Sequence, residues 1–304
     1  MKIAILSNGP GNYSTKRLKQ VALERGHEVD IIKYRDCYAS IEKSQPTVWY
    51  NGEPLTGYDA IIPRIASSMT RYGSMIVRQF EMQGIYTITS SISIVRSRDK
   101  LRSMQLLARA GVGIPKTVVS RGASSDSDDL IDQLGGAPVI IKLARGTHGN
   151  GVVLAESKKA AKSVLQAFYV MDQDGTNILL QEFVKESAGM DIRVFVVGGK
   201  VIASMKRQSL DDDFRSNLHQ GGQGEKVKLT DEERKVSIKA ARSMGLNLCG
   251  VDLMRSERGP LVLEVNSSPG FGIEEVTGRD LATPIIEYIE RNAKRSNRKD
   301  KVGA

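Results

Sequence analysis

The sequence contains few of the features that mark disulfide-rich or membrane-spanning proteins. Its 304 residues include two cysteines, Cys37 and Cys249, which lie far apart and form no CxxC pair. This spacing excludes a disulfide framework and argues against a zinc knuckle. No apolar run approaches the roughly 18 residues of a membrane span, and the apolar run after Met1 is too short for a signal-peptide core. We therefore expect a cytoplasmic protein without a membrane partner.

Aromatic and histidine residues are also scarce. Aromatic side chains make up 5% of the chain, with Trp49 the single tryptophan, which offers no stacking platform for single-stranded nucleic acid. The three histidines match no metal-binding spacing. Basic charge, in contrast, is abundant: 44 Lys and Arg against 35 Asp and Glu leave a net charge of +9. That excess is compatible with nucleic acid, anionic lipid or an acidic substrate.

The composition is that of a globular protein with more than one domain. Hydrophobic residues make up 40% of the chain, and its length corresponds to about two domains of roughly 150 residues. Strand-like and helix-like segments alternate up to residue 90, which predicts a parallel, Rossmann-like α/β sheet covered by helices. The predicted strands are 2–7, 29–32, 60–63 and 85–89, with helices around Leu18 and at 74–82. The segment 36–57 is less regular.

The rest of the chain has an α+β pattern. A helix is predicted from Ser97 through Leu107, and a last helix begins near Thr283. The other predicted elements are strands 138–143, 152–155 and 177–183, helices 158–167 and 231–244, and hairpins of 191–197 with 201–206 and of 248–254 with 260–265. We expect an α/β domain at 1–95, two α+β lobes at 96–186 and 187–290, and a basic tail at 291–304.

Two glycine-containing turns are candidates for binding phosphate. The turn Gly9-Pro10-Gly11 lacks the third glycine of a dinucleotide fingerprint, because Ser14 stands there, which favours a tight strand-to-helix turn. The second turn follows Lys142 and contains Gly146, Gly149 and Gly151. Its backbone amides could surround a polyanion beside the lysine charge, although a hairpin turn without a ligand has the same composition.

Three oxygen-bearing side chains fall on the last predicted hairpin. Glu264 and Asn266 lie two residues apart on one strand and share a face, and the hairpin register places Asp252 opposite them. Two carboxylates and an amide, without His or Cys, suit Mg²⁺ or Mn²⁺. The alternative, solvated surface acids, is weakened because the neighbouring strand positions are apolar.

A group of cations lies on and after the first hairpin. It contains Arg193, Lys206, Arg207 and Arg215, with Asn217 and His219 close by. Arginine forks match the geometry of carboxylates and phosphates. Charges at alternating strand positions also occur on solvated faces, so the pattern alone leaves both interpretations open.

Several of these motifs together resemble those of ATP-grasp carboxylate–amine ligases. The resemblance rests on Lys142 with the 146–151 loop, on Gln181-Glu182-Phe183-Val184, and on Asp252 with Glu264-Val265-Asn266-Ser267-Ser268-Pro269-Gly270. Residues 98–109, 135–138 and Asp213-Phe214-Arg215-Ser216-Asn217-Leu218-His219 resemble the RimK family, which are glutamate ligases of this superfamily. The similarity extends from Met1 to about residue 290 and implies an ATP-grasp fold preceded by a pre-ATP-grasp domain.

The resemblance implies a role for each matching residue. Lys100 and Lys142 would contact the phosphates of ATP, and the loop with Gly146, Gly149 and Gly151 would close over them. Gln181, Glu182, Phe183, Val184 and Lys185 would surround the adenine, and Asp191 would bind the ribose. Arg207, Arg215, Ser216 and Asn217 would line the phosphate and acyl-phosphate region, and Asp252, Glu264 and Asn266 would bind two Mg²⁺ or Mn²⁺ ions. Some ATP-grasp ligases carry an arginine where this chain has Gly250, so Arg207 or Arg215 would supply that charge.

The implied activity is ATP-dependent addition of L-glutamate to a protein carboxyl terminus through an acyl phosphate. The acceptor would be an acidic-tailed small-subunit ribosomal protein, and the enzyme a homo-oligomer, with a tetramer as one form. A sister ligase that makes oligoglutamate or modifies another peptide or cofactor is the alternative. A non-catalytic basic module that binds RNA or the ribosome is a third hypothesis, but the excess of positive charge fits an anionic acceptor better than nucleic acid.

Overall fold

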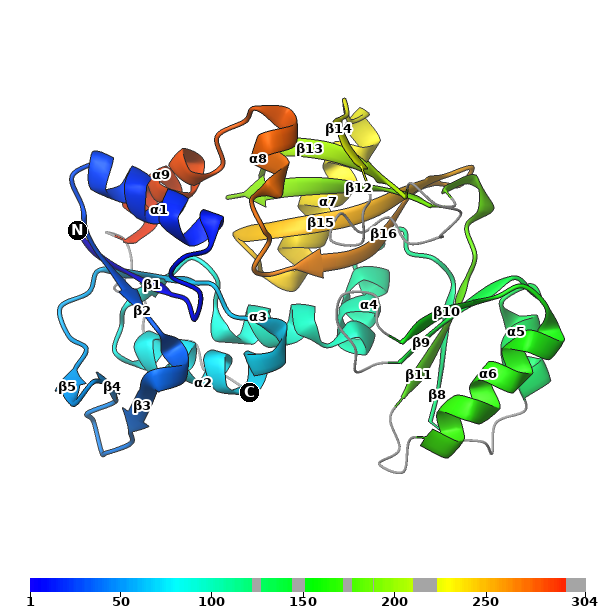
Figure 1. Cartoon of the computed structure of the whole chain (residues 1–304), viewed down its shortest axis with the longest axis horizontal. Coiled ribbons are helices and arrows are strands. Elements are labelled where there is room, and N and C mark those ends of the chain that lie inside the picture. The colour runs from blue at the N-terminus through cyan, green and yellow to red at the C-terminus, as the bar shows by residue number, and fades with distance from the viewer. Residues whose placement is uncertain (122–126, 144–150, 172–176, 188, 210–222, 294–304) are drawn as a thin grey trace.

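The computed structural model describes residues 1–121, 127–143, 151–171, 177–187, 189–209 and 223–293. Within these ranges the strands form four sheets, and the three larger ones follow one another across the molecule (Figure 1). A parallel sheet lies at one end, a four-stranded antiparallel sheet at the other, and a five-stranded antiparallel sheet between them. Among the described helices, none combines the length and the apolar character needed to cross a bilayer.

The N-terminal sheet has the predicted parallel topology. Its order is β2-β1-β6-β7, formed by β1 (Lys2–Leu6), β2 (Glu28–Ile32), β6 (Ala60–Pro63) and β7 (Tyr86–Thr87). Ile3 and Ile5 pack toward α1 (Tyr13–Glu24), while Ala4 and Leu6 pack toward α2 (Thr70–Met82). Alternate residues of β1 therefore fill two different cores, as expected for a sheet covered on both faces.

The irregular segment 36–57 forms a small sheet that the sequence did not predict. It contains β3 (Cys37–Ser40), β4 (Thr47–Tyr50) and β5 (Glu53–Pro54), paired antiparallel in that order. Tyr38 and Trp49 face each other across β3 and β4 with nearly parallel rings. Short strands joined by tight turns carry too little periodicity for recognition from sequence.

The helix predicted from Ser97 through Leu107 is present, but it begins at Lys100, and a separate helix that the sequence did not predict precedes it. α3 (Ser91–Arg98) ends at Arg98, and α4 (Lys100–Arg109) begins two residues later. Asp99 between them has an extended backbone, and its carboxylate accepts the Arg102 backbone N–H at 3.0 Å. An N-cap that binds the amide three residues ahead starts a new helix, which breaks the first one here. Arg98 and Lys100 lie on either side of this break. Burial lowers the pKa of both side chains, and the negative charge of Glu264 opposes that effect.

The four-stranded sheet forms the lobe farthest from the N-terminal sheet. Its order is β10-β9-β11-β8, from β8 (Thr117–Ser120), β9 (Val139–Leu143), β10 (Val152–Ala155) and β11 (Ile178–Glu182). α5 (Ser127–Gln133) and α6 (Lys158–Met171) cover one face and enclose a core of their own. β9, β10 and β11 lie where the sequence predicts strands, whereas β8 was not predicted as a regular element.

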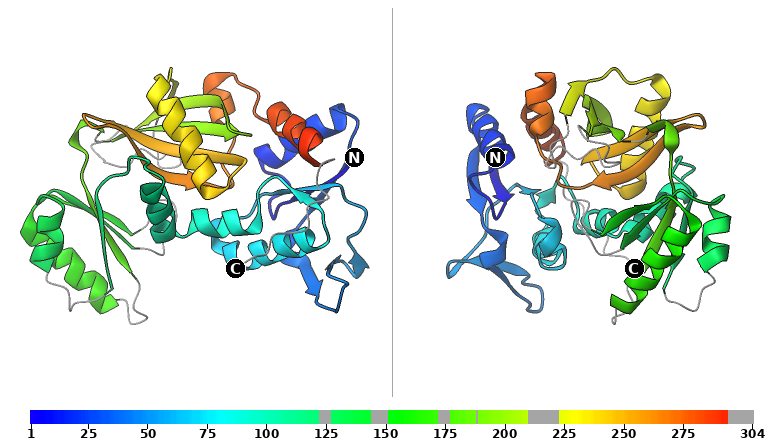
Figure 2. Two further views of the ribbon diagram at one scale, coloured as in Figure 1. Left: turned by 180° about the vertical axis from the view of Figure 1, so that it is seen from behind. Right: turned by 45° about the vertical axis from the view of Figure 1, so that its right-hand side comes forward.

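The five-stranded sheet lies between two helices. Its order is β14-β13-β12-β15-β16, from β12 (Met190–Val197), β13 (Lys200–Gln208), β14 (Gln223–Lys226), β15 (Leu248–Ser256) and β16 (Gly259–Asn266). α7 (Asp231–Met244) crosses one face, as the rear view in Figure 2 shows, and α8 (Gly272–Thr277) covers part of the other. Both predicted hairpins and the predicted helix 231–244 are present.

The last described helix returns to the beginning of the chain. α9 (Ala282–Ala293) packs beside α1, and Arg25 and His27 bind Glu290 with closest distances of 2.7 and 2.8 Å. Ile285, Ile286 and Ile289 of α9 share a core with Ile3 and Ile5 of β1. The N-terminal domain therefore packs against residues nearly 290 positions away. The first three residues of the predicted tail, 291–293, belong to α9. The predicted boundaries at residues 95 and 186 stay a prediction.

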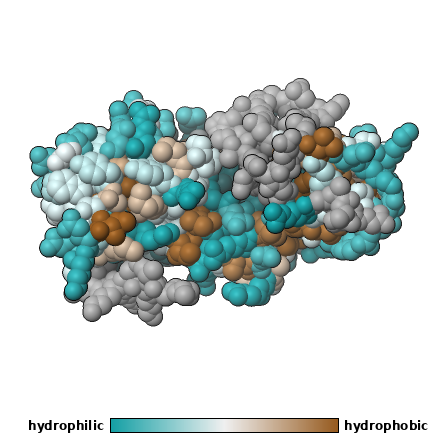
Figure 3. All heavy atoms as spheres, turned by 90° about the horizontal axis from the view of Figure 1, so that it is seen from below, coloured by the Kyte–Doolittle hydropathy of each residue, from teal (hydrophilic) through white to brown (hydrophobic). Residues whose placement is uncertain are grey.

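On the face drawn in Figure 3, the described hydrophobic residues appear as separate patches among hydrophilic ones. Scattered apolar residues of this kind are normal on a protein surface.

Candidate active site

One face of the five-stranded sheet changes from apolar to charged along its length. Phe195 and Leu248 pack into the core beneath α8. Two and four residues away on the same strands and face lie Arg193 and Asp252. Asp252 lies between Arg193 on β12 and Glu264 on β16 in the strand register, and Asp191 is paired with Arg207 on β13. The sheet thus brings together the acids and cations that the sequence placed on separate hairpins.

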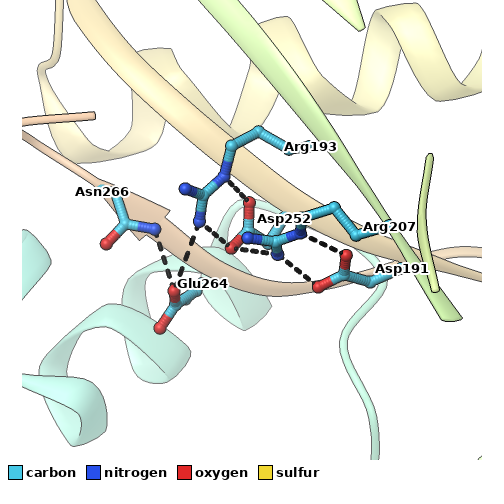
Figure 4. A network of polar contacts seen from close by, with 6 residues as sticks. All are labelled: Asp191, Arg193, Arg207, Asp252, Glu264 and Asn266. Atoms are coloured by element: carbon cyan, nitrogen blue, oxygen red, sulfur yellow. Dashed lines mark hydrogen bonds and ion pairs between the residues drawn. The ribbon is translucent and has the colours of Figure 1, made fainter. Parts of the chain in front are cut away.

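Two arginines bind two aspartates in this charged region (Figure 4). Arg193 donates two hydrogen bonds to Asp252, from Nε at 2.7 Å and from Nη2. Arg207 binds Asp191 in the same forked way, with Nε at 2.6 Å from Oδ1, and its Nη2 also lies 2.9 Å from Asp252 Oδ2. Two guanidinium and two carboxylate groups therefore form a connected, charge-balanced quartet.

The quartet explains the protonation state of its members. Burial by itself would raise the pKa of Asp252, but Arg193 and Arg207 outweigh it and hold that pKa well below its usual range. Burial raises the pKa of Asp191, which binds only one of the two arginines. Burial would lower the pKa of Arg207, whereas Asp252 and Asp191 raise it above its usual value. Asp252 is therefore the most firmly ionised acid of the group.

Glu264 and Asn266 lie beside the quartet in a more open position. Asn266 Nδ2 donates to Glu264 Oε1 at 2.8 Å, and the Glu264 side chain is 53% exposed, against 3% for Asp252. Arg193 Nη2 is 3.9 Å from Glu264 Oε1. The predicted alignment of Asp252 with Glu264 is confirmed by the register, and Asn266 lies opposite Gly250.

These oxygen donors fit a hard divalent cation in their chemistry. Asp252, Glu264 and Asn266 supply two carboxylates and one amide, the ligand types that Mg²⁺ and Mn²⁺ prefer. No cluster of three or more His, Cys, Asp or Glu side chains within the described ranges is placed to hold a metal ion by itself. The amide oxygen of Asn266 is therefore needed as the third donor, and the assignment of this set as metal ligands stays a prediction.

Two lysines approach the same region, Lys100 from helix α4 and Lys142 from the four-stranded antiparallel sheet. Lys100, the first residue of α4, donates to the Leu143 carbonyl at 3.3 Å. Lys142 on β9 donates to Gln181 Oε1 at 2.6 Å. Burial lowers the pKa of Lys142 to about 8, with Lys100 acting in the same direction and Glu264 in the opposite one. Both ammonium groups therefore lie within electrostatic range of Glu264, across the boundary between two sheets.

The connection between these sheets contains the residues predicted to surround adenine. Gln181 is buried and uses its side chain on Lys142 and on Thr117 Oγ1, the latter at 2.9 Å. Glu182 accepts the Lys116 backbone N–H at 2.6 Å. Val184 is buried, Phe183 is half-buried and Lys185 is exposed. The backbone that follows β11 connects it to β12, so Phe183 and Val184 lie just past the end of β11.

Several predicted site residues lie outside the described residues. These are Gly146, Gly149, Arg215, Ser216 and Asn217. The end of the glycine loop is described: Gly151 has φ of +74°, and its carbonyl accepts the Leu143 N–H at 3.0 Å. Leu143 and Gly151 are thereby paired at the end of the β9–β10 ladder, next to Lys142, whose register partner is Val152.

Arg193 is a site residue whose role the sequence did not reveal. The sequence placed it on the same strand face as Asp191 but assigned the charge missing at Gly250 to Arg207 or Arg215. In the structure, the Arg193 side chain crosses Gly250, with Cδ and Nε 3.8 Å from the position a Cβ would occupy. The Arg193 side chain thus lies alongside Gly250, and an arginine from the neighbouring strand reaches Asp252. The pairing of β12 with β15, which makes Arg193 the register partner of Asp252, would have revealed this contact, whereas no sequence motif does.

Comparison with solved structures identifies the fold. The structure resembles that of the ATP-grasp ligase PsnB complexed with minimal precursor, Mg and ADP, with a TM-score of 0.73 and 18% identity over 97% of this chain and 98% of that one. At this identity the likeness shows the fold alone. The predicted ATP-grasp fold, with its N-terminal parallel α/β domain, is thereby confirmed, and the class is that of ATP-dependent carboxylate–amine ligases.

Sequence comparison identifies the family. Residues 1–94 match the RimK PreATP-grasp domain, and residues 97–289 match the RimK-like ATP-grasp domain. Proteins named probable alpha-L-glutamate ligase are 56% identical in Nitrosococcus oceani, over 97% of both chains, and 57% identical in Aliivibrio fischeri, over 96% of both. The chain belongs to the RimK-like ATP-grasp family.

Proposed function

We propose that this protein is an ATP-dependent α-L-glutamate ligase that extends the carboxyl terminus of an acidic-tailed small-subunit ribosomal protein through an acyl phosphate. The name of the relatives supports glutamate as the amine substrate. One structural observation carries the proposal. Asp252 and Glu264 are register partners on neighbouring strands, and Glu264 lies within electrostatic range of Lys100 on α4 and Lys142 on β9. Anionic and cationic groups placed in this way suit a metal-bound polyphosphate.

The two lysines would bind the phosphates. A carboxylate is a poor acyl donor because its oxygen is a poor leaving group, and phosphorylation replaces that leaving group with phosphate. Lys100 and Lys142 would neutralise the charge on the phosphoryl group during transfer, together with the backbone amides of the loop that includes Gly146, Gly149 and Gly151. The adenine would lie along 181–185, next to the buried Gln181 that binds Lys142.

The ligand set Asp252, Glu264 and Asn266 would hold two Mg²⁺ or Mn²⁺ ions. Such ions polarise phosphoryl oxygens and offset their charge. The half-exposed Glu264 is the accessible member of the set, while Asp252 is kept ionised by its arginines. The PsnB structure is described as complexed with Mg and ADP, which supports magnesium for the fold.

The arginines would act after phosphorylation. Arg207, Arg215 and Asn217 would bind the acyl phosphate and the oxyanion that forms when the glutamate amine attacks, and Ser216 would bind phosphate beside them. Arg207 already holds Asp191 and Asp252 in place. Each Asp191 oxygen retains a lone pair beyond its bond to Arg207, so Asp191 would still accept a ribose hydroxyl. Water must be excluded, since it would hydrolyse the acyl phosphate.

The surroundings of this activity also belong to the proposal. An acidic acceptor tail and free glutamate are both anions, which the net charge of +9 attracts. We propose a homo-oligomer, with a tetramer as one form, located in the cytoplasm. The two free, buried thiols of Cys37 and Cys249 support a reducing compartment.

The experiment combines purified protein with ATP, Mg²⁺ or Mn²⁺ and L-glutamate. The acceptors are the acidic-tailed ribosomal protein, the same protein without its tail, a short acidic peptide, and no acceptor. Mass spectrometry would show glutamyl units added to the tailed protein alone, together with ADP. Extension of the peptide, or oligoglutamate without an acceptor, would support a sister ligase. Folded protein that forms neither product nor ADP would contradict the proposal.

A further inference from the structure

Two arginines lie where the N-terminal sheet meets the hairpin that carries Glu264. Arg64 follows β6, and its Nη2 donates to the Pro269 carbonyl at 2.7 Å and to Ser14 Oγ at 3.1 Å. Arg98 ends α3, and its Nη2 donates to the Ile65 carbonyl at 3.0 Å. The positive charge of Arg98 lowers the pKa of Arg64, and the negative charge of Glu264 raises the pKa of Arg98. Both arginines therefore lie close to the proposed reaction centre.

Several polar atoms at this junction have no partner within the described part of the chain. Arg64 Nη1 and Arg98 Nε are buried donors without an acceptor, and the hydroxyl groups of Ser267 and Ser268 are buried without a hydrogen bond. The two serines directly follow Asn266 and precede the Pro269 that Arg64 contacts. Buried polar groups are nearly always paired, so a cluster of four unpaired ones needs an explanation.

The charges at the junction are also unbalanced. No Asp or Glu of the described residues forms an ion pair with Arg64 or Arg98, whereas Arg193 and Arg207 nearby bind two aspartates. Burial, and then the neighbouring Arg98, lowers the pKa of Arg64 to about 10. Burial also lowers the pKa of Arg98, although Glu264 opposes it. Two buried guanidinium groups without acids favour an anionic ligand, and carboxylates match their forks.

We propose that Arg64 and Arg98, together with the hydroxyls of Ser267 and Ser268, bind the two carboxylates of the amino acid that supplies the amine. This inference rests on the proposed glutamate ligase function. The terminal carboxylate of the acceptor is the reacting group and must reach the phosphate. The incoming dicarboxylate, in contrast, keeps both carboxylates unchanged and needs a permanent cation for each. A ligand held beside Ser267 has its amine close to Asn266 and Glu264, where the activated carbonyl is expected.

The test measures specificity as well as binding. Kinetic constants for L-glutamate, L-glutamine, ATP and acceptor are compared for the full-length wild type, Arg64→Lys and Arg98→Lys. Arg35→Lys is the control, because Arg35 lies in the same N-terminal domain, is 57% exposed and pairs only with Asp36 among the described residues. Glutamine has nearly the shape of glutamate but lacks the γ-carboxylate. Calorimetric titration of L-glutamate into each protein provides a readout that needs no turnover.

We expect Arg64→Lys and Arg98→Lys each to weaken glutamate binding and raise its KM about 10- to 100-fold, the effect of losing one charge-assisted hydrogen bond. In at least one of them the preference for glutamate over glutamine falls by a similar factor. All constants of Arg35→Lys, and the KM for ATP in every variant, stay at wild-type values. Lysine keeps the positive charge, so a loss of binding reports the forked geometry.

Three results would overturn the inference. Wild-type glutamate affinity and wild-type discrimination in both variants would show that the arginines do not touch the amine substrate. A rise in the KM for acceptor alone would assign them to the acceptor tail. A lower Tm with equal rises in every KM would show that Arg64 and Arg98 only hold the domains together. If the wild type binds glutamate and the variants do not, but no ligation occurs, the carboxylate site stands and the proposed function fails.

Discussion

Asp252 and Glu264 are register partners on neighbouring strands, yet their surroundings predict different consequences of losing one charge. The Asp252 side chain is 3% exposed and accepts hydrogen bonds from two arginines. The Glu264 side chain is 53% exposed, accepts from Asn266, and lies 3.9 Å from one Arg193 nitrogen. The isosteric variants Asp252→Asn and Glu264→Gln therefore separate structural from chemical roles at one site.

Asp252→Asn should strongly destabilise the fold. It leaves Arg193 and Arg207 with Asp191 as their remaining buried counter-ion, and it can turn an amide donor toward guanidinium donors. Breaking a buried ion pair from one side costs about 3–5 kcal/mol. Glu264→Gln keeps an oxygen for Asn266 and loses only a weak, partly exposed ion pair, so it should cost less than about 1 kcal/mol.

Urea denaturation measures the stability of each variant, and ADP release in the presence of Mg²⁺ measures the chemistry. We expect both variants to lose ADP formation, because each removes a proposed metal ligand, while only Asp252→Asn shifts the urea midpoint substantially. Glu225→Gln is the control. Its carboxylate is 65% exposed on the same sheet and pairs with Lys206 at 2.6 Å, outside the proposed ligand set.

Two outcomes would refute this reasoning. Wild-type stability of Asp252→Asn would show that the arginine quartet does not hold the sheet together. Wild-type ADP formation by Glu264→Gln would remove the metal site, whatever its stability. Loss of ADP formation in Glu225→Gln would show that the assay responds to general perturbation.

Three further perturbations follow from particular contacts. Burial lowers the pKa of Lys142 to about 8, so this lysine is cationic below pH 8, and the KM for ATP should rise above that pH. Lys142→Arg, which stays charged, should flatten the dependence of this KM on pH, and identical pH dependence in wild type and variant would contradict a phosphate contact. Asp99→Ala removes the N-cap hydrogen bond to Arg102 and should lower the free energy of thermal unfolding by about 1 kcal/mol. It should also raise the KM for ATP, because the first turn of α4 is displaced. An unchanged Tm would contradict the cap. The Arg25 hydrogen bond, despite some burial, lowers the pKa of Glu290 from 4.5 to about 2, so the ion pair stabilises the fold above about pH 4.5 and is lost as the pH falls toward 2. In urea, Glu290→Gln should be about 1 kcal/mol less stable than wild type at pH 7 and equally stable near pH 2. A difference in stability that does not change with pH would contradict the linkage.

Much of the secondary structure could be predicted because it depends on local patterns. The parallel sheet, both hairpins of the third region and the helix 231–244 are present where periodicity and turn residues place them. That helix illustrates the reason: Thr230 and Glu233 form a capping box, and Gly245 ends it in the left-handed conformation. The start of α4 was predicted three residues too early, because the extended capping residue Asp99 leaves no mark in the apolar periodicity that predicted the helix.

The site could be predicted only in part. Strand alternation placed Glu264 beside Asn266, and the hairpin turn placed Asp252 opposite, because both depend on neighbouring residues in one hairpin. Resemblance to a family named Lys100, Lys142 and the glycine loop. Neither source revealed that Arg193 crosses Gly250 to bind Asp252.

The sequence by itself determined the kind of protein: its α/β and α+β elements, its oxygen-rich hairpin and its family. Tertiary structure alone decided which charges are balanced. Arg193 and Arg207 acquire aspartates because β12 lies between β13 and β15, whereas Arg64 contacts the segment after β16 and, like Arg98, has no ion pair with an acid among the described residues. Local patterns set the direction of a side chain on its own element. The partner of a buried charge depends on sheet order and domain packing, which join residues more than 200 positions apart.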